Sequence, residues 1–386
     1  GQAMIELFWL LLPVAATSGW LVAKGYYRRH MTPISSKSMD AQYFQGLNYL
    51  LNEQSDKALD LFVNLSDINQ DTLDLHLALG SLFRRKGEVD RAIAIHQNLL
   101  SRQNLPLTLK DQCLLELAQD YLKAGLLDRA ERIFIDLRQS SSLSAPALFG
   151  LLEVYQREKE WLRAINTAQA YEKLSGDSQV TNIAHYYCEL ANQAMILGEK
   201  NEVLKQLKMA LLTDPGCARA NLIQSQLEIK QGNYKIATQL LLNIIDQDPA
   251  FLGEVIDPLI VCVENQGKIS GLVNKLSGLV NKYSSNKSVT LFSQFLQKYQ
   301  GTENAIALIE SHLEESPSAL GLKRYLELSI VNVKPEQKNY MEKLLIIVNG
   351  LIQQTMAYRC EQCGFSARAI HWQCPSCNAW GSVKPL

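Results

Sequence analysis

The stretch LALGSLFRRKGEVDRAIAIHQNLL at residues 77–100 decides the fold, because a related stretch, LELAQDYLKAGLLDRAERIFIDLR, follows at residues 115–138. Both place a glycine five residues before an alanine, as Gly87 stands before Ala92. Glycine readily adopts the left-handed conformation in which many helices end. The small alanine lets a second helix approach the first closely. Each stretch therefore predicts a pair of helices joined at the glycine.

The alanine position recurs through the middle of the chain at nearly even spacing. Its occupants are Ala58, Ala92, Ala130, Ala164, Val203, Ala237, Leu272 and Ala305. Their successive spacings run from 33 to 39 residues, and three of them are 34. A period of 34 is typical of tetratricopeptide repeats, whose stacked helix pairs bury apolar faces that no pair can bury alone. The sequence resembles such an array from residue 39 to about residue 317, and one more helix pair is expected to follow.

Other recurring residues indicate where the helices lie within each repeat. Aromatic residues nine positions before the alanine are expected on the first helix of a pair: Tyr49, Phe83, Tyr121 and Tyr155. Phe62 and Phe134, four positions after it, are expected on the second helix. Prolines spaced by 34 residues and twice 34 residues are expected to close helices before the next repeat: Pro215, Pro249 and Pro317. The repeat at residues 255–276 matches weakly, and Glu228 stands at an aromatic position.

The chain starts with an uncharged apolar run, LFWLLLPVAATSGWLVA, at residues 7–23. At about 1.5 Å per residue, a helix of this length is near the lower limit for spanning a bilayer. Glu6 precedes the run, and basic residues follow it from Lys24 onward. This distribution favours a retained anchor over a cleaved signal peptide, and the positive-inside rule places the body of the protein in the cytoplasm.

Composition limits the classes of function. With 386 residues, 47% of them hydrophobic, the chain can build a packed core, and its net charge of −1 gives no large attraction to nucleic acid. The basic part of residues 83–92 is expected to be a solvated helix end. No phosphate-binding glycine loop and no motif of a hydrolase occurs, so the chain is not expected to be an enzyme or to bind an organic cofactor. Four cysteines are expected to be buried as small hydrophobic residues: Cys113, Cys188, Cys217 and Cys262.

The other four cysteines lie near the end of the chain, in YRCEQCGFSARAIHWQCPSCNAW at residues 358–380. Cys360, Cys363, Cys374 and Cys377 have two, ten and two residues between them, which is the spacing of a tetrahedral site with four thiolate ligands. Gly364 and Asn378 each follow a pair and tolerate the positive φ that such a turn needs.

Trp372 and Trp380 are expected to supply the apolar packing of this small segment. Four thiolates suit one ion of either zinc or iron, and a reducing cytoplasm disfavours disulfides. The knuckles resemble rubredoxin, which carries an electron on iron. The segment from Tyr358 to Leu386 is too small to fold without its metal, which favours a structural role whichever ion is bound. A zinc ribbon for nucleic acid would require more Lys and Arg around the knuckles than Arg359, Arg368 and Lys384.

Three stretches together resemble the lipopolysaccharide assembly protein B family: ELFWLLLPVAATSGW at residues 6–20, LFRRKGEVDRAIAIHQ at 82–97 and CGFSARAIHWQCPSCNAWGSVKP at 363–385. The resemblance implies an all-α tetratricopeptide superhelix with an N-terminal transmembrane helix and a small C-terminal rubredoxin-like metal domain, packed against the repeats. The predicted boundaries are a cloning remnant at 1–3, the anchor at 4–24, a juxtamembrane linker at 25–38, about eight to nine helix pairs at 39–355, and the metal domain at 356–386.

The same resemblance implies a function and a location. Members of the family lie in the inner membrane of Gram-negative bacteria, with the body facing the cytoplasm. They act as adaptors that bring the deacetylase of the lipid A pathway to a membrane-bound AAA+ protease, and an inner-membrane regulator that senses lipopolysaccharide restrains them. A scaffold for lipopolysaccharide assembly without proteolysis and a rubredoxin-like electron carrier are the alternatives. Formation of a homo-oligomer remains open, and no nucleic-acid partner is expected.

Overall fold

The structure is a computed structural model, and it describes residue 20 and residues 44–46, 48–49, 54–63, 70–102, 105–267, 269–283 and 285–386. The predicted anchor at 4–24, apart from Trp20, and the predicted linker at 25–38 lie outside the described residues. Within the described residues, no helix combines the length and the apolar composition needed to cross a bilayer. The chain divides into two compact units, Gly1–Leu143 and Ser144–Leu386.

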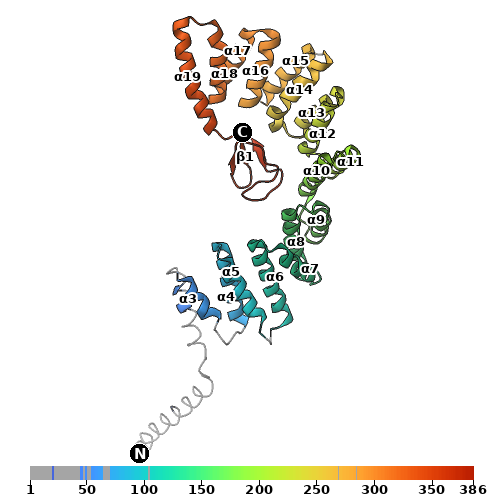
Figure 1. The fold of residues 1–386 in the computed structure, drawn as a ribbon, viewed down its shortest axis with the longest axis vertical. Helices are drawn as coiled ribbons and strands as arrows, with labels where there is room; N and C mark the ends of the chain where they lie inside the picture. Colours follow the sequence, from blue (N-terminus) through green and yellow to red (C-terminus); the bar gives the residue numbers. More distant parts are fainter. Residues whose placement is uncertain are drawn as a thin grey trace, which may run out of the picture. The chain divides into compact units, whose positions relative to one another are not determined.

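Helices make up the described part of the first unit (Figure 1). They are α3 (Ser55–Val63), α4 (Gln70–Lys86), α5 (Val89–Leu100), α6 (Leu107–Ala124) and α7 (Leu127–Leu137). The helices α4 and α5 form one pair, and α6 and α7 form the next. These two pairs contain the stretches at residues 77–100 and 115–138, from which the helix pairs were predicted.

The second unit continues with six further helix pairs and ends in three short strands. The pairs are α8 (Ser144–Glu158) with α9 (Trp161–Ser175), α10 (Val180–Ile196) with α11 (Lys200–Thr213), α12 (Ala218–Lys230) with α13 (Tyr234–Gln247), α14 (Leu252–Gln266) with α15 (Ile269–Lys282), α16 (Asn286–Gln300) with α17 (Thr302–Glu315), and α18 (Ala319–Ser329) with α19 (Pro335–Gln354). Two 3₁₀ turns, η1 (Pro249–Phe251) and η2 (Ile330–Asn332), lie between helices. The additional pair predicted after residue 317 is therefore present as α18 and α19.

The glycine between the helices of a pair has the predicted left-handed conformation. Gly87, Gly125, Gly198, Gly232 and Gly267 all have positive φ, between 67° and 85°. The pair of α8 and α9 differs, because Lys159 occupies this position with φ 58°. A residue that bears a Cβ atom is strained in this conformation. The strain at Lys159 destabilises its repeat locally, and the packing of that repeat must offset it.

The alanine position is the centre of each helix pair. Its described occupants are at most 6% exposed, including the two positions where valine and leucine replace alanine. Phe83, Tyr121 and Tyr155 on the first helices and Phe134 on the second helix are buried as predicted. Tyr49 packs against the core around Phe83. Repetition of these contacts gives each pair a buried apolar centre against its neighbours, and the largest buried cluster extends from α12 to α18.

The basic helix end at residues 83–92 is only partly solvated, which corrects the prediction. Arg85 and Lys86 are exposed, but Arg84 is 15% exposed and bridges two repeats. Its guanidinium binds Glu116 Oε2 at 2.6 Å and Asp120 Oδ1 at 2.7 Å, both on α6. The acidic partners lie more than thirty residues away, so the local charge pattern could not predict this ion pair.

The weakest repeat nevertheless forms a helix pair. Pro258 lies inside α14, and the four scattered cysteines, including Cys262 on the same helix, are buried as predicted. Glu228 is buried at the expected aromatic position, where its Oε2 accepts a 2.7 Å hydrogen bond from Asn233 Nδ2. The predicted prolines fall after helix ends: Pro215 follows α11, Pro249 begins η1, and Pro317 follows α17.

Candidate metal centre

The terminal segment, residues 358–386, folds as a small antiparallel sheet with two turns that carry the cysteine pairs. Its strands are β1 (Tyr358–Cys360), β2 (Ser366–Ala367) and β3 (Val383–Pro385), in the order β2-β1-β3. Tyr358 lies opposite Ala367 on one side and opposite Pro385 on the other. The sheet therefore fixes Cys360 at the end of its central strand, where the first turn begins.

The two turns have the same backbone design. In the first, Gly364 N–H donates to Cys360 O at 2.9 Å, and in the second, Asn378 N–H donates to Cys374 O at 2.9 Å. Gly364 has φ 76° and Asn378 has φ 60°, as the sequence predicted. Asparagine is the residue after glycine that most readily adopts this conformation. The two turns thereby direct both cysteine pairs toward the same side of the segment.

All four predicted cysteines meet at one point. Their sulfur atoms lie within 4.8 Å of one another. Cys360 Sγ is 3.7 Å from Cys377 Sγ, and Cys363 Sγ is 3.6 Å from Cys374 Sγ. A tetrahedral ion with bonds of about 2.3 Å to sulfur requires sulfur atoms about 3.8 Å apart, whereas a disulfide requires about 2.05 Å. The arrangement thus fits a four-thiolate metal site and not a disulfide.

The electrostatics of the four thiols also fit a cation. The Ser382 hydroxyl, 3.3 Å from Cys360 Sγ, lowers the pKa of Cys360 to about 6, together with the backbone N–H groups of Gln362 and Cys363. The Ala379 N–H lowers the pKa of Cys377, but burial and the other three thiols outweigh it and raise the value to about 12. Neighbouring thiolates oppose one another's ionisation, so a cation at their centre is what would stabilise all four as thiolates.

The segment has little core of its own. Its buried cluster consists of Tyr358, Cys360, Ala367, Cys374 and Val383. Two of these five residues belong to the candidate metal site. A segment of this size rarely folds on apolar burial alone and depends on a metal or on docking.

The two tryptophans of the segment pack against the repeats, which corrects the prediction that they supply the segment's own packing. Trp380 is 8% exposed, stacks on His185 at 5.4 Å between ring centroids and meets Trp161 edge-on at 6.0 Å. Trp372 stacks on Phe251 at 5.6 Å. These partners come from α9, α10 and η1, so the aromatic contacts join the segment to several parts of the array.

Polar contacts surround this aromatic cluster. Lys384 forms an ion pair with Asp248, and the Tyr358 hydroxyl donates a 2.6 Å hydrogen bond to Glu254 Oε1. Gln156 Oε1 on α8 accepts hydrogen bonds from Trp380 Nε1 at 3.0 Å and from Gln373 Nε2 at 3.2 Å. The predicted packing of the metal domain against the repeats is therefore present.

Two buried polar side chains, Arg219 and His185, contact the tryptophans. Arg219 is 5% exposed, pairs with Glu189 at 2.6 Å, and holds its guanidinium 5.5 Å from the ring centroid of Trp372. Burial, with Arg219 and Lys384 nearby, lowers the pKa of His185 to about 3. The sequence identified neither residue as part of the interface. The available signal in the sequence was a basic residue at a helical position that is buried. This signal does not indicate which residues it contacts.

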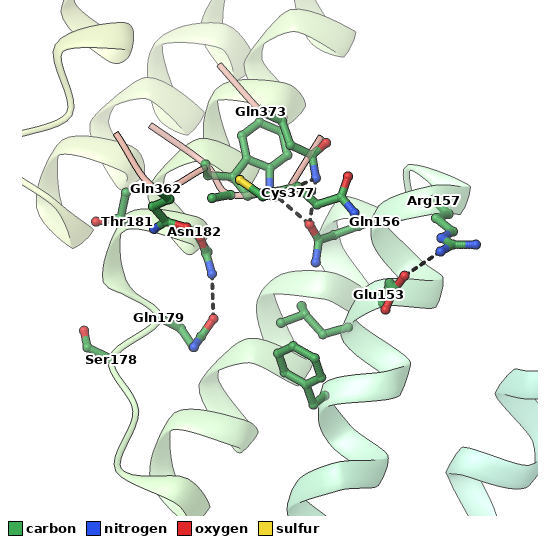
Figure 2. A pocket seen from close by; sticks show the side chains of 15 residues that line it. Glu153, Gln156, Arg157, Ser178, Gln179, Thr181, Asn182, Gln362, Gln373 and Cys377 are labelled. Carbon is green, nitrogen blue, oxygen red and sulfur yellow. Dashed lines mark hydrogen bonds and ion pairs between the residues drawn. The ribbon is translucent and has the colours of Figure 1, made fainter. Parts of the chain in front are cut away.

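A cavity of about 620 Å³ opens beside the second knuckle (Figure 2). Phe149 and Gln156 of α8 line one side, Asn182 of α10 lines another, and Cys377 and Asn378 of the knuckle contribute to the third. Cys363 and Cys377 are the exposed members of the thiol cluster.

Comparison with known proteins agrees with this architecture. Residues 358–385 match the family described as a rubredoxin metal binding domain. Lipopolysaccharide assembly protein B of Escherichia coli (strain K12) is 33% identical over 386 residues, which cover 99% of this chain and 98% of that protein. The protein of the same name from Haemophilus influenzae is 32% identical over 394 residues, with the same two shares covered.

Among solved structures, a tetratricopeptide repeat protein from Parabacteroides merdae aligns with a TM-score of 0.34 and 14% identity, over 72% of this chain and 98% of that one. The identity to the two curated relatives extends over nearly the whole of each chain. This chain therefore belongs to the lipopolysaccharide assembly protein B family.

Proposed function

We propose that this protein is a membrane-anchored adaptor that controls lipopolysaccharide synthesis by presenting the deacetylase of the lipid A pathway to a membrane-bound AAA+ protease. The observation that carries the proposal is the combination, in one member of this family, of a repeat array with a docked four-cysteine segment. Repeat arrays of this kind bind protein segments. Chemistry contributed by the chain itself is not required for such a role.

A tether to the membrane suits an adaptor of this kind. A protease confined to a membrane encounters a substrate receptor on the same surface at a raised effective concentration. The anchor at residues 4–24 would supply that tether in the inner membrane, with the body facing the cytoplasm. The regulator that senses lipopolysaccharide would act on the adaptor from the same membrane.

In this proposal the four thiolates of Cys360, Cys363, Cys374 and Cys377 hold one zinc or iron ion in a structural role. The ion supplies charge neutralisation and cross-links the two knuckles. The chain's own residues do the rest: Trp372, Trp380 and Lys384 fix the loaded segment to the repeats.

The half-life of the deacetylase tests the adaptor function. It is measured after translation is stopped, in cells depleted of this protein and in cells that express it without residues 4–24. We expect a much longer half-life on depletion, and a partial increase when the anchor is removed while the body still folds. An unchanged half-life on depletion would reject the adaptor and favour a scaffold that acts without proteolysis.

The exposure of Cys363 and Cys377 favours a second candidate, electron transfer by a rubredoxin-like iron site. This function requires bound iron with reversible redox chemistry. Full control of the deacetylase by a protein loaded only with zinc would exclude it.

A further inference from the structure

We propose that the cavity between α8, α10 and the two knuckles binds an extended, uncharged peptide segment of a partner protein. The inference rests on the adaptor function proposed above, because that function supplies the partner, the deacetylase. It goes further by assigning a site and a class of ligand.

The walls of the cavity come from parts of the chain that are distant in sequence. Phe149 and Gln156 lie on α8, Gln179 and Asn182 lie at the start of α10, and Gln362 belongs to the terminal segment (Figure 2). The volume of about 620 Å³ falls within the range of about 300–1,000 Å³ in which ligand sites are found. Because the knuckles form one wall, the cavity is complete only when the terminal segment is folded and docked.

Side-chain amides are the most frequent kind of side chain in the lining. They are Gln156, Gln179, Asn182, Gln362, Gln373 and Asn378. Each amide offers two N–H donors and one carbonyl acceptor, and each residue of an extended peptide offers one of each on its backbone. A wall of amides can therefore pair with a peptide backbone without requiring one particular side chain.

Several of these amides are oriented by hydrogen bonds to other residues. Because Gln156 Oε1 accepts from both Trp380 and Gln373, Gln156 Nε2 points the opposite way, toward the cavity (Figure 2). Asn182 Nδ2 donates to Gln179 Oε1 at 2.7 Å, which holds these two amides together at the start of α10. Such preorganisation lowers the entropy cost of binding.

The charge of the lining disfavours an anion. Among the described residues of the cavity wall, the acidic and basic side chains are Glu153 and Arg157, and they form an ion pair at 2.5 Å. An anion such as a phosphate group would have to compete with Glu153 for Arg157. A neutral segment leaves this ion pair in place.

Aromatic exposure favours a peptide over a sugar. Carbohydrate sites commonly offer a flat aromatic face, but here the ring of Trp380 is covered by His185, Trp161 and Tyr186. Phe149 lines the cavity, is 56% exposed and packs against Tyr171, with 5.7 Å between the ring centroids. An exposed aromatic edge of this kind can receive one apolar side chain of a bound segment.

The test measures the affinity of the full, metal-loaded chain for intact deacetylase and for overlapping 15-residue synthetic peptides that cover its sequence. The variants are Phe149→Ala and Asn182→Leu at the cavity. Leu162→Ala is the matched control, because Leu162 is 62% exposed on α9 and does not line the cavity. Metal content of each variant verifies that the terminal segment is still folded.

We expect each cavity variant to weaken the binding of the deacetylase and of one uncharged peptide about tenfold, and Leu162→Ala to leave both affinities unchanged. Equal binding of the deacetylase by wild type and both cavity variants would overturn the site while leaving the adaptor intact. No binding by any form of the chain would instead reject the proposed function. Loss of affinity confined to highly charged peptides, or binding of a neutral disaccharide such as maltose without any peptide, would overturn the assigned ligand class.

Discussion

The helix pairs and the terminal segment achieve stability in opposite ways. From α12 to α18 a single cluster of more than twenty buried residues continues from one pair to the next. The terminal segment has a buried cluster of five residues, and two of them are cysteines of the candidate metal site. Each helix pair therefore depends on many small contacts, whereas the segment has the candidate metal site and one docking surface in place of a core.

This difference teaches where a substitution is tolerated. In the array, Val203 and Leu272 occupy the alanine position and are buried there, so this position accepts a larger apolar side chain. In the segment, no other residue type reproduces four converging thiolates. The predictions below test whether this contrast holds, beginning with the change expected to have the largest effect.

Replacing Cys374 by serine is expected to unfold the terminal segment and leave the helices intact. Cys374 is fully buried, and a structural ion contributes on the order of 10–16 kcal/mol to the folding of domains of this kind. Metal analysis should show loss of the ion, and fluorescence of Trp372 and Trp380 should shift to the red while helical circular dichroism persists.

The matched control is Cys262→Ala, which removes an equally buried thiol from α14. It is expected to cost only about 1 kcal/mol and to keep the metal. A Cys374→Ser protein that still held one ion per chain would contradict the four-thiolate site.

Trp380→Ala tests the docking surface separately from the metal. Removing this buried ring is expected to cost about 3–5 kcal/mol and to release the segment from α9 and α10 with its ion still bound. Limited proteolysis between residue 355 and residue 358 should become faster. His371→Ala, which alters an exposed ring of the same segment, should leave the cleavage rate unchanged. A rate insensitive to both changes would show that the aromatic cluster does not hold the segment.

Acid is expected to weaken the interface through His185. Its pKa is lowered from 6.5 to about 3, by burial first and then by the positive charges of Arg219 and Lys384. The unfolded chain binds a proton near pH 6.5 that the folded chain rejects until about pH 3, so the free energy of unfolding falls as the pH falls between these values. From pH 7 to pH 5 the loss is about 2 kcal/mol.

Urea unfolding at pH 7 and at pH 5 measures this loss, with His185→Phe as the control. Protonation of the thiols destabilises both proteins in acid, so the difference between them isolates His185. We expect the variant to lose about 2 kcal/mol less than the wild type over this range. An identical loss in both proteins would show that His185 is not the group that titrates.

The smallest expected effect lies in the array. Lys159→Gly should stabilise the pair of α8 and α9 by about 0.5–1 kcal/mol, because glycine removes the strain of a Cβ at φ 58°. Gly125→Ala, the reverse change at φ 78°, should destabilise its pair by about 1 kcal/mol. Urea unfolding measures both. A destabilising Lys159→Gly would mean that contacts of the lysine side chain outweigh the backbone strain.

The sequence by itself determined the features that depend on near neighbours in the chain. The glycine and alanine positions of the repeats, the burial of Phe83 and Phe134, and the paired turns at Gly364 and Asn378 all follow from local rules. Helix ends and tight turns are specified by a few adjacent residues, and the cysteine spacing specifies a four-thiolate site in the same way.

Only the tertiary structure decided which distant residues meet. Trp380 and Gln156 are 224 residues apart in sequence, and Tyr358 and Glu254 are 104 apart. The array brings them together because α8, α10, α12 and α14 all contact the one returning segment. Burial of His185 and Arg219 at a contact between distant elements leaves no periodic trace in the sequence. For this reason the residues of the interface and its cavity could not be predicted, although the repeats and the knuckles could, and the family resemblance implied the docking itself.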